Sequence, residues 1–468
     1  MSTFQKDMTQ GSVVSHLIRF SLPFLAANLL QALYNMVDML IVGRYCGPVG
    51  TSAVGAGGTI TILVINLISG LAVGGTVLIA QFIGARRQQD MERTVGTMFT
   101  LYAIASVIFT TVMLLMNRHI LNLLNVPSEA FDDALSYLNI CMGGTVFVFG
   151  YNAVSAVLRG MGDSRHPLLF VAISTVVNII LDIIFVAPLG MGVSGAAWAT
   201  IIAQAVSFIL SIMFLRKRNF IFDFHPRSFR IQKNIAIQLL KIGLPTSLQG
   251  TLVSFSFMWL MRLANDIAGI VGLNALSITG KVNSVAILPA IAMQISVSSM
   301  VGQNLGAGKP ARAKKAVFAA MGLAFLFSFA VFVAVNLFSE QIVLMFLGTD
   351  NTELSSEIIE QCIISGAEYM RYYSYDYLIV CFSFCINGLA MGAGQTLFSL
   401  FNAMASSLLL RVPVAWLLGI HFDLKLVGVG LAAPIAGLGS LLVGIVYFIL
   451  GSWRKSSIKS ITTSTADG

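Results

Sequence analysis

Long apolar runs, each of about 20 or more residues, follow one another through almost the whole chain. Each run is long enough to cross the roughly 30 Å hydrocarbon core of a lipid bilayer. Charged residues make up only 10% of the chain, whereas soluble domains contain about 25%. The runs lack the alternation of apolar and polar residues that is typical of transmembrane β-barrels. We therefore predict an all-α polytopic membrane protein.

The number of apolar runs predicts twelve transmembrane helices, six in each half of the chain. Polar segments separate the runs, and a basic connector divides the two sets. In the first half the runs fall near residues 16–42, 51–80, 95–116, 131–157, 167–188 and 194–215, and in the second half near residues 236–262, 272–301, 315–338, 371–389, 396–420 and 427–450.

The two halves match each other at a constant offset, which indicates an internal repeat. An even number of spans returns the chain to its starting side, so the two halves share one orientation in the membrane. We predict two pseudo-symmetric six-helix bundles, arranged as parallel repeats around a central cavity. The first lobe comprises residues 1–215, the connector 216–235, and the second lobe 236–468 with a polar cytoplasmic tail. Pairs at an offset of 222 positions include Pro23 and Pro245, Gly50 and Gly272, Gln81 and Gln303, and Gly84 and Gly306.

The 28 Lys and Arg residues are distributed unequally between the two sides of the predicted membrane domain. Most lie in the termini, the connector and the loops of one side, which the positive-inside rule places in the cytoplasm. We therefore expect a multi-pass protein of the cell membrane with both termini cytoplasmic. This distribution also accounts for the net charge of +8 without a nucleic-acid partner.

The sequence contains no pattern typical of an enzyme or of a cofactor site. Its five histidines lie in loops or near span ends and form no metal-binding motif, and its five cysteines have no metal-type spacing. No pair of a nucleophile and a base can be recognised within the spans. We expect no catalytic residue, no cofactor and no bound metal other than sodium.

A stripe of polar side chains runs along the first predicted span. Gln31, Tyr34, Asn35 and Asp38 are spaced so that they lie on one face of a helix. Because burying one charge in a bilayer costs at least about 3 kcal/mol, an intramembrane Asp indicates a functional site. The stripe faces a cavity or a neighbouring helix, since its exposure to lipid would be costly. A structural hydrogen-bond network between helices is the alternative interpretation.

A second polar group lies in the fifth and sixth predicted spans. Asn178 and Asp182 share one helix face, and Thr200 follows Ala196 by one turn in the next span. If these faces meet Asp38, their carboxylate, amide and hydroxyl oxygens would suit a small hard cation such as Na+. The same cluster could hold a proton instead, because two carboxylates close together in an apolar setting repel each other. The residues alone leave both alternatives open.

Pro23 lies one turn inside the first predicted span and removes a backbone hydrogen bond there. Such a proline can kink a helix, either as a static bend or as a moving hinge below Asp38. Pro245 occupies the equivalent place in the seventh span.

The second half of the chain lacks the acidic pair of the first half. Leu260 stands at the position that corresponds to Asp38, and the second half instead carries Lys281, Arg411 and Asp376 within its spans. Lys281 either pairs with Asp376 or contacts substrate. We therefore expect the cation chemistry to be concentrated in the first lobe.

Together these features resemble the multidrug and toxic compound extrusion (MATE) transporters, and most closely their bacterial, DinF-like branch. The resemblance extends over residues 14–450, and its most familiar segments are residues 35–43, 81–86 and 159–167. It implies a cation-coupling site in the first lobe and a first span that bends at Pro23. The residues implied for the cation site are Asp38, Asn178, Asp182, Ala196 and Thr200. The candidate residues of the substrate cavity are Gln31, Tyr34, Asn35, Asn152, Lys281 and Arg411.

The function that follows from the resemblance and from the acidic cluster is secondary active multidrug efflux. We expect H+ or Na+ to enter in exchange for small organic compounds, mostly cationic and amphipathic, by alternating access of the two lobes. The alternative is a flippase for lipid-linked oligosaccharide precursors, for which Lys281 and Arg411 would supply positive charge. We expect a monomer in the lipid bilayer, with small-molecule substrates as its partners.

Overall fold

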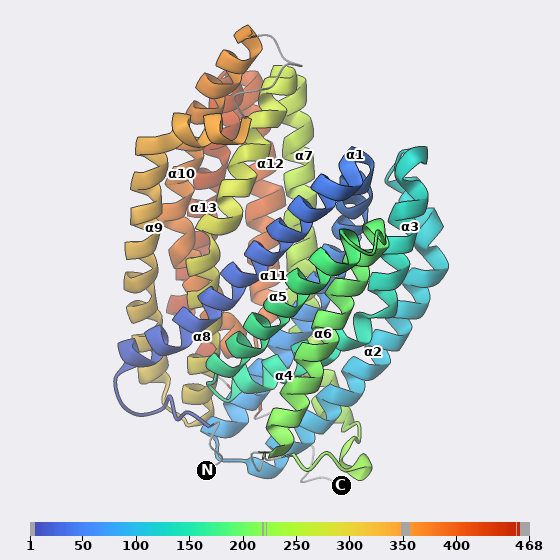
Figure 1. Cartoon of the computed structure of the whole chain (residues 1–468). Helices are drawn as coiled ribbons and strands as arrows, with labels where there is room; N and C mark the ends of the chain where they lie inside the picture. The colour runs from blue at the N-terminus through green and yellow to red at the C-terminus, as the bar shows by residue number, and fades with distance from the viewer. Residues whose placement is uncertain (1–4, 218–219, 221, 348–355, 455, 459–468) are drawn as a thin grey trace.

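The structure, a computed structural model, describes residues 5–217, 220, 222–347, 356–454 and 456–458. In this part of the chain the regular elements are helices, and no strand occurs. Three positions of the predicted connector and the polar tail beyond residue 458 lie outside the described residues. The helices run side by side in two groups, and both chain termini lie at one end of the bundle (Figure 1). We refer to this end as the terminal end.

The first lobe contains helices α1 to α6, and the second lobe contains helices α7 to α13 with two π-helical segments (Figure 1). The first set comprises α1 (Val13–Gly84), α2 (Gln88–Leu123), α3 (Ser128–Gly143), α4 (Thr145–Gly160), α5 (Arg165–Val186) and α6 (Gly192–Lys217). The second set comprises α7 (Lys233–Ala286), α8 (Leu288–Gly306), α9 (Pro310–Leu347), α10 (Ser356–Gly392), α11 (Thr396–Met404), η2 (Ala405–Arg411), α12 (Val412–Trp416), η3 (Leu417–His421) and α13 (Lys425–Leu450). Two short 3-10 turns are η1 (Pro226–Ser228) in the connector and η4 (Ser452–Arg454) after α13.

The two longest helices, α1 and α7, each fold back on themselves at a glycine. Gly47 has φ 66° and ψ −164°, and Gly269 has φ 54° and ψ −134°. A left-handed backbone costs a residue with a side chain roughly 1–2 kcal/mol, so glycine suits both turns. A Cβ atom placed on Gly50 would lie 3.4 Å from Val42 Cγ1, whereas a straight helix separates residues eight apart by about 12 Å. The two turn glycines are 222 positions apart, so the repeat extends to the backbone conformation.

Among the described residues, eight helices are long and apolar enough to cross a membrane, and ten spans result if each of two bent pairs counts as one. The bent pairs are α3 with α4, at 45°, and α7 with α8, at 40°. Because α1 folds back at Gly47 and α7 folds back at Gly269, each of these helices supplies one further crossing. The resulting twelve crossings confirm the predicted number.

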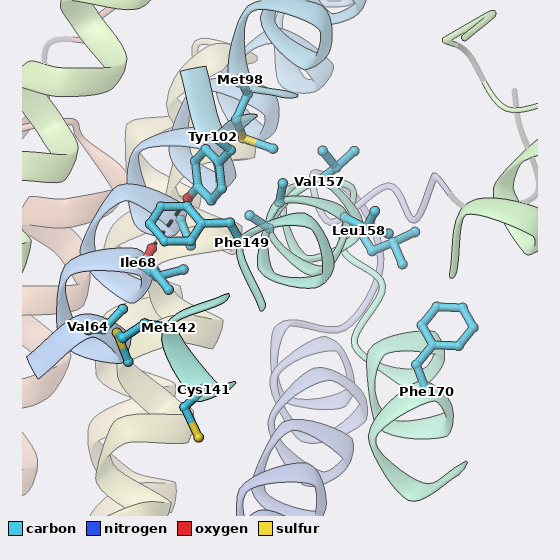
Figure 2. Close-up of a cluster of buried hydrophobic side chains, with 14 of the residues drawn as sticks. Val64, Ile68, Met98, Tyr102, Cys141, Met142, Phe149, Val157, Leu158 and Phe170 are labelled. Atoms are coloured by element: carbon cyan, nitrogen blue, oxygen red, sulfur yellow. Dashed lines mark hydrogen bonds between the residues drawn. The ribbon is translucent and has the colours of Figure 1, made fainter. Parts of the chain in front are cut away.

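An extensive apolar cluster holds the first lobe together (Figure 2). The Tyr102 ring of α2 meets the Phe149 ring of α4 edge-on, with centroids 5.9 Å apart. The Tyr102 hydroxyl donates to the Ile68 carbonyl of α1 at 3.4 Å, which satisfies a polar group that would otherwise be buried alone. Helices α1, α2 and α4 of the first lobe are therefore joined at one point.

The two lobes exchange the first turns of their opening helices at the terminal end. Residues from the start of α1 and from the segment before it are buried in the core of the second lobe. Residues from the start of α7 are buried in the core of the first lobe. At this end the boundary between the cores therefore differs from the boundary between the two halves of the sequence. The exchanged residues are Met8, Leu17 and Phe20 on one side, and Ile235, Leu239 and Ile242 on the other.

Two glutamines from equivalent positions of the repeat join the lobes at the terminal end. Gln81 Nε2 donates to the Gly392 carbonyl at 2.8 Å, and Gln303 Nε2 donates to the Gly160 carbonyl at 3.4 Å. Both glutamine side chains are completely buried. Because Gly160 and Gly392 also correspond to each other, at an offset of 232, the two bonds are related by the pseudo-symmetry of the lobes.

The same two glutamines bind the described ends of the chain. Gln303 Oε1 accepts the Met8 amide at 2.9 Å, and Gln81 Oε1 accepts the Ile458 amide at 3.3 Å. Each side chain therefore uses its NH2 group across the lobe interface and its oxygen toward a terminal segment. The terminal end is closed by contacts from both lobes and from both chain ends.

Candidate cation and substrate site

A cavity of about 770 Å³ lies between the lobes, and most of its wall belongs to the first lobe. Both arms of α1 and parts of α3, α4, α5 and α6 line it, and α7, α8 and α10 contribute the remainder. Small-molecule sites commonly enclose roughly 300–1,000 Å³. The cavity is therefore large enough for a drug-sized organic compound.

The polar stripe of the first span faces this cavity. Gln31, Tyr34, Asn35 and Asp38 all line its wall, because α1 is helical through these positions and places them on one face. The Gln31 and Tyr34 side chains lie one turn apart on this face. Asp38 retains 7% of its surface. The stripe thus presents one nearly buried carboxylate and several neutral polar groups to the cavity.

Asn178 and Asp182 lie on α5, which packs against α1. Asp182 is completely buried and close enough to Asp38 for their negative charges to repel each other. Both Asp182 oxygens, Asp38 Oδ1 and both polar atoms of the Asn178 amide have no hydrogen-bond partner among the described residues. Unpaired polar groups buried in this way are costly. Such a cluster can bind a proton or a small hard cation that satisfies its oxygens.

Helix α6 completes the surroundings of the cluster, since it packs against both α5 and α1. Thr200 lines the cavity, and Ala196, one turn earlier, is completely buried. In the described part of the chain, no group of three or more His, Cys, Asp or Glu side chains could hold a metal ion. Asp38 and Thr200 therefore line the cavity, whereas Asn178, Asp182 and Ala196 are buried outside its lining.

Asn152 and Lys281, two of the predicted cavity residues, have different surroundings. Asn152 lines the cavity, and its Nδ2 donates to the Val148 carbonyl at 2.8 Å. Lys281 lies outside this lining, with its ammonium 5.4 Å from the centre of the Phe346 ring. The ion pairs found within 4.0 Å among the described residues do not include Lys281 with Asp376.

Arg411 also lies outside the lining of this cavity, in the second lobe. Its guanidinium is 5.3 Å from the centre of the Tyr373 ring. It interacts electrostatically with Asp376, the intramembrane carboxylate of α10. Its Nε is buried without a hydrogen-bond partner among the described residues. The second-lobe carboxylate Asp376 thus interacts electrostatically with a cation, although the two do not form an ion pair within 4.0 Å among the described residues, whereas no cation interacts in this way with Asp38 or Asp182.

Helix α1 continues without a break through Pro23. The non-helical dihedral angles within α1 occur at Gly47. Just beyond the proline, Asn28 Nδ2 donates to the Phe24 carbonyl at 2.8 Å, and both residues line the cavity. Pro23 therefore lies inside an intact helix at the edge of the cavity wall, and its role as a hinge stays a prediction.

Arg159 is a cavity residue that the sequence analysis did not identify. Its position just after the predicted span 131–157 is typical of the basic residues of a cytoplasmic loop. In the structure it lines the cavity at the end of α4. A signal was present in the sequence, since Arg159 follows Asn152 by seven positions and both therefore lie on one helix face.

Comparisons with known proteins agree with this architecture. A family model described as MatE matches residues 23–184 and 245–417, which is more than half of the chain. The chain is 28% identical over 452 residues to the probable multidrug resistance protein YpnP of Bacillus subtilis, covering 97% of this chain and 98% of that protein. It is 26% identical over 197 residues to the DNA damage-inducible protein F of Escherichia coli, covering 42% and 43% respectively.

The fold is also similar to that of a solved structure. The TM-score is 0.87 at 26% sequence identity, and the match covers 98% of this chain and all of the other. That structure is described as the outward-facing conformation of a multidrug resistance transporter of the MATE family and the MOP superfamily.

Proposed function

The chain belongs to the MatE family, and from that premise we propose that it exports small organic compounds, mostly cationic and amphipathic, in exchange for H+ or Na+. It is similar over nearly its full length to a protein named for multidrug resistance. The flippase alternative is not favoured, because the family model and the structural neighbour both correspond to multidrug transporters.

The observation that carries the proposal is the pair of acidic residues Asp38, which lines the cavity, and Asp182, which is buried behind the lining. Their negative charges repel each other, and Asp38 Oδ1, both Asp182 oxygens and the Asn178 amide have no hydrogen-bond partner among the described residues. We assign cation binding to these three residues, with Ala196 and Thr200 contributing from α6. A proton or Na+ that binds there removes negative charge from the cavity and so weakens its attraction for a cationic substrate.

Exchange then follows from competition between the coupling ion and the substrate. The coupling ion enters from the side opposite the terminal end, neutralises the cluster and releases the substrate from the Gln31, Tyr34 and Asn35 face. The two lobes rock to open the cavity at the other side. We place the terminal end in the cytoplasm of a cell-membrane protein that acts as a monomer, because most of the basic loops lie there.

The number of ions per cycle determines the driving force. Exchange of one proton for one monovalent cation moves no net charge, so only the ion gradient drives it. If both carboxylates carry an ion, one net positive charge enters per cycle, which adds roughly 2.3 kcal/mol per 100 mV of membrane potential.

The proposal is tested by reconstituting the protein into liposomes with a fluorescent organic cation. A pH gradient without sodium and a sodium gradient at constant pH are imposed separately, and dye movement is followed in each case. Asp38→Asn should abolish movement under the effective gradient, while Asp266→Asn, which changes an exposed carboxylate, should retain it. Dye movement that ignores both gradients would refute exchange.

A further inference from the structure

The cavity contains a positive charge that the proposed exchange does not use. Of the charged side chains that line it, Asp38 is negative and Arg159 is positive. They lie toward opposite ends of the cavity. Arg159 packs on Phe24, which precedes Asp38 in α1 by fourteen residues, or about 21 Å of helix.

The backbone that carries Arg159 is fixed at the interface between the lobes. The Arg159 carbonyl accepts a hydrogen bond from Ser299 Oγ of α8 at 2.9 Å, and the next carbonyl, that of Gly160, accepts the Gln303 bond. The guanidinium carbon lies 5.9 Å from the centre of the Phe24 ring. Its position in the cavity is therefore set by contacts from both lobes.

The guanidinium has no anionic partner in the described part of the chain. No Asp or Glu oxygen there lies within 4.0 Å of it, unlike the guanidinium of Arg87 or Arg371. The side chains that face it, Phe24, Tyr102 and Tyr151, are uncharged. Both tyrosine hydroxyls donate to backbone carbonyls instead. Arg159 thus presents unused N–H donors and an uncompensated charge to the cavity.

We infer that Arg159 determines specificity in this cavity, because its guanidinium recognises an anionic group, such as a carboxylate, on the transported compound. A guanidinium binds a carboxylate through two parallel hydrogen bonds, more strongly and with more defined geometry than an ammonium does. The cationic group of the same molecule is attracted toward Asp38, and its apolar body lies against residues such as Val73 and Val148. The inference rests on the proposed function, because it names a residue that selects among compounds in the same cavity.

The test compares two dyes that differ at one group, a rhodamine ethyl ester and the corresponding free acid. The ester is a cation, and the acid is a zwitterion with almost the same shape. In liposomes under the effective ion gradient, Arg159→Gln should raise KM for the acid at least about tenfold, the effect of losing a charge-assisted pair. KM for the ester should change less than about twofold, since the ester has no carboxylate to lose.

Arg159→Lys is the matched variant, because it keeps the charge and removes the paired donors. It should raise KM for the acid severalfold and leave the ester unaffected. Equal effects of either variant on both dyes, or no effect on the acid, would overturn the inference. If Arg159→Gln does not yield a monodisperse protein, the outcome with Arg159→Lys decides.

The result also separates the inference from the proposed function. Ion-driven movement of the ester by the unaltered protein supports exchange whatever Arg159 does. If neither dye moves, exchange is contradicted, and dye binding to the detergent-solubilised protein then decides on Arg159. A loss of affinity for the acid alone in Arg159→Gln supports this role of Arg159, and equal affinities in both proteins contradict it.

Discussion

The two lobes share a backbone plan but hold their intramembrane charges in different ways. In the first lobe, Asp38 and Asp182 repel each other and no cation is paired with either within 4.0 Å among the described residues. In the second lobe, Asp376 interacts electrostatically with Arg411, and Leu260 replaces the first carboxylate. The repeat therefore preserves the turns and the contacts between the lobes. A carboxylate pair that an incoming cation could neutralise occurs only in the first lobe among the described residues.

The largest expected effect tests this difference directly. Asp38→Asn should reduce ion-driven transport at least about 100-fold, which corresponds to losing a buried charge interaction of roughly 3 kcal/mol. The double variant Asp376→Asn with Arg411→Gln removes both interacting charges of the second lobe together and should stay within about threefold, since replacing two opposite charges as a whole is often nearly neutral. The rate of dye movement in liposomes measures both, and equal losses would remove the proposed asymmetry.

The next largest effect concerns the buried glutamines Gln81 and Gln303, which make equivalent contacts in the two lobes. Gln81→Ala and Gln303→Ala each leave a buried carbonyl unpaired, which costs about 1–3 kcal/mol and should open the terminal end about 5- to 160-fold more often. Hydrogen exchange at the Ile458 and Met8 amides reports this opening, because those amides are bound to the two glutamines. If each substitution accelerates exchange at both amides, the two contacts open together, whereas strictly local effects would show that they are independent.

A smaller effect, of the same size in the two lobes, is expected at the turn glycines Gly47 and Gly269. Gly47→Ala and Gly269→Ala should each lower the free energy of unfolding by about 1–2 kcal/mol, because alanine resists a positive φ. A Cβ atom at either position would meet no other atom within 4 Å, so the cost comes from the backbone alone. Thermal unfolding in detergent, compared with Gly58→Ala, measures it. Gly58 also has open space around it but no positive φ.

The smallest effect is a change in stability at the loops that follow α4 and α10. These loops occupy equivalent places in the two lobes but differ in charge. Asp163, in the first of these loops, is buried, and its carboxylate accepts the Arg165 amide at 3.0 Å and contacts His166. Burial raises the pKa of Asp163, but these hydrogen bonds and the positive charges of His166 and Lys6 outweigh it, so the pKa lies below the usual 3.8. The equivalent residue of the second lobe, at an offset of 232, is the neutral Gln395.

The sign of the pH dependence follows from the lowered pKa. The carboxylate contributes stability that is fully present above the usual pKa and is lost as the pH falls through the folded value. Asp163→Asn should therefore cost about 1 kcal/mol at pH 7, as for the loss of a helix-capping residue, and nothing once Asp163 is protonated. Gln395→Ala should cost the same at every pH above 3. Thermal unfolding between pH 3 and 8 compares them, and a pH-independent effect of Asp163→Asn would contradict this account.

Periodicity and hydropathy predicted the features that depend on local sequence. The number of crossings followed from run length, and the cavity-facing stripe from Gln31 to Asp38 followed from helical spacing. Sequence does not determine how a helix is rotated against its neighbours, and so Lys281 was expected in the cavity but lies over Phe346, outside the lining described here. Arg159 was missed for a related reason, because the end of a span can turn toward a cavity or toward water. The repeat identified Gln81 and Gln303, but their bonds depend on contacts between the lobes that local patterns do not contain.

The exchange of opening turns between the lobes has a consequence for how the chain is assembled during synthesis. The core of the first lobe is incomplete until Ile235, Leu239 and Ile242 have emerged from the ribosome, although they follow the connector. Met8, Leu17 and Phe20 are translated before the rest of the first lobe. They pack into the core of the second lobe, which is translated after it. Two separately translated polypeptides, divided within the connector, would each carry the piece that the other half needs. The halves should therefore recognise each other when they are co-expressed, and neither should mature when it is produced alone.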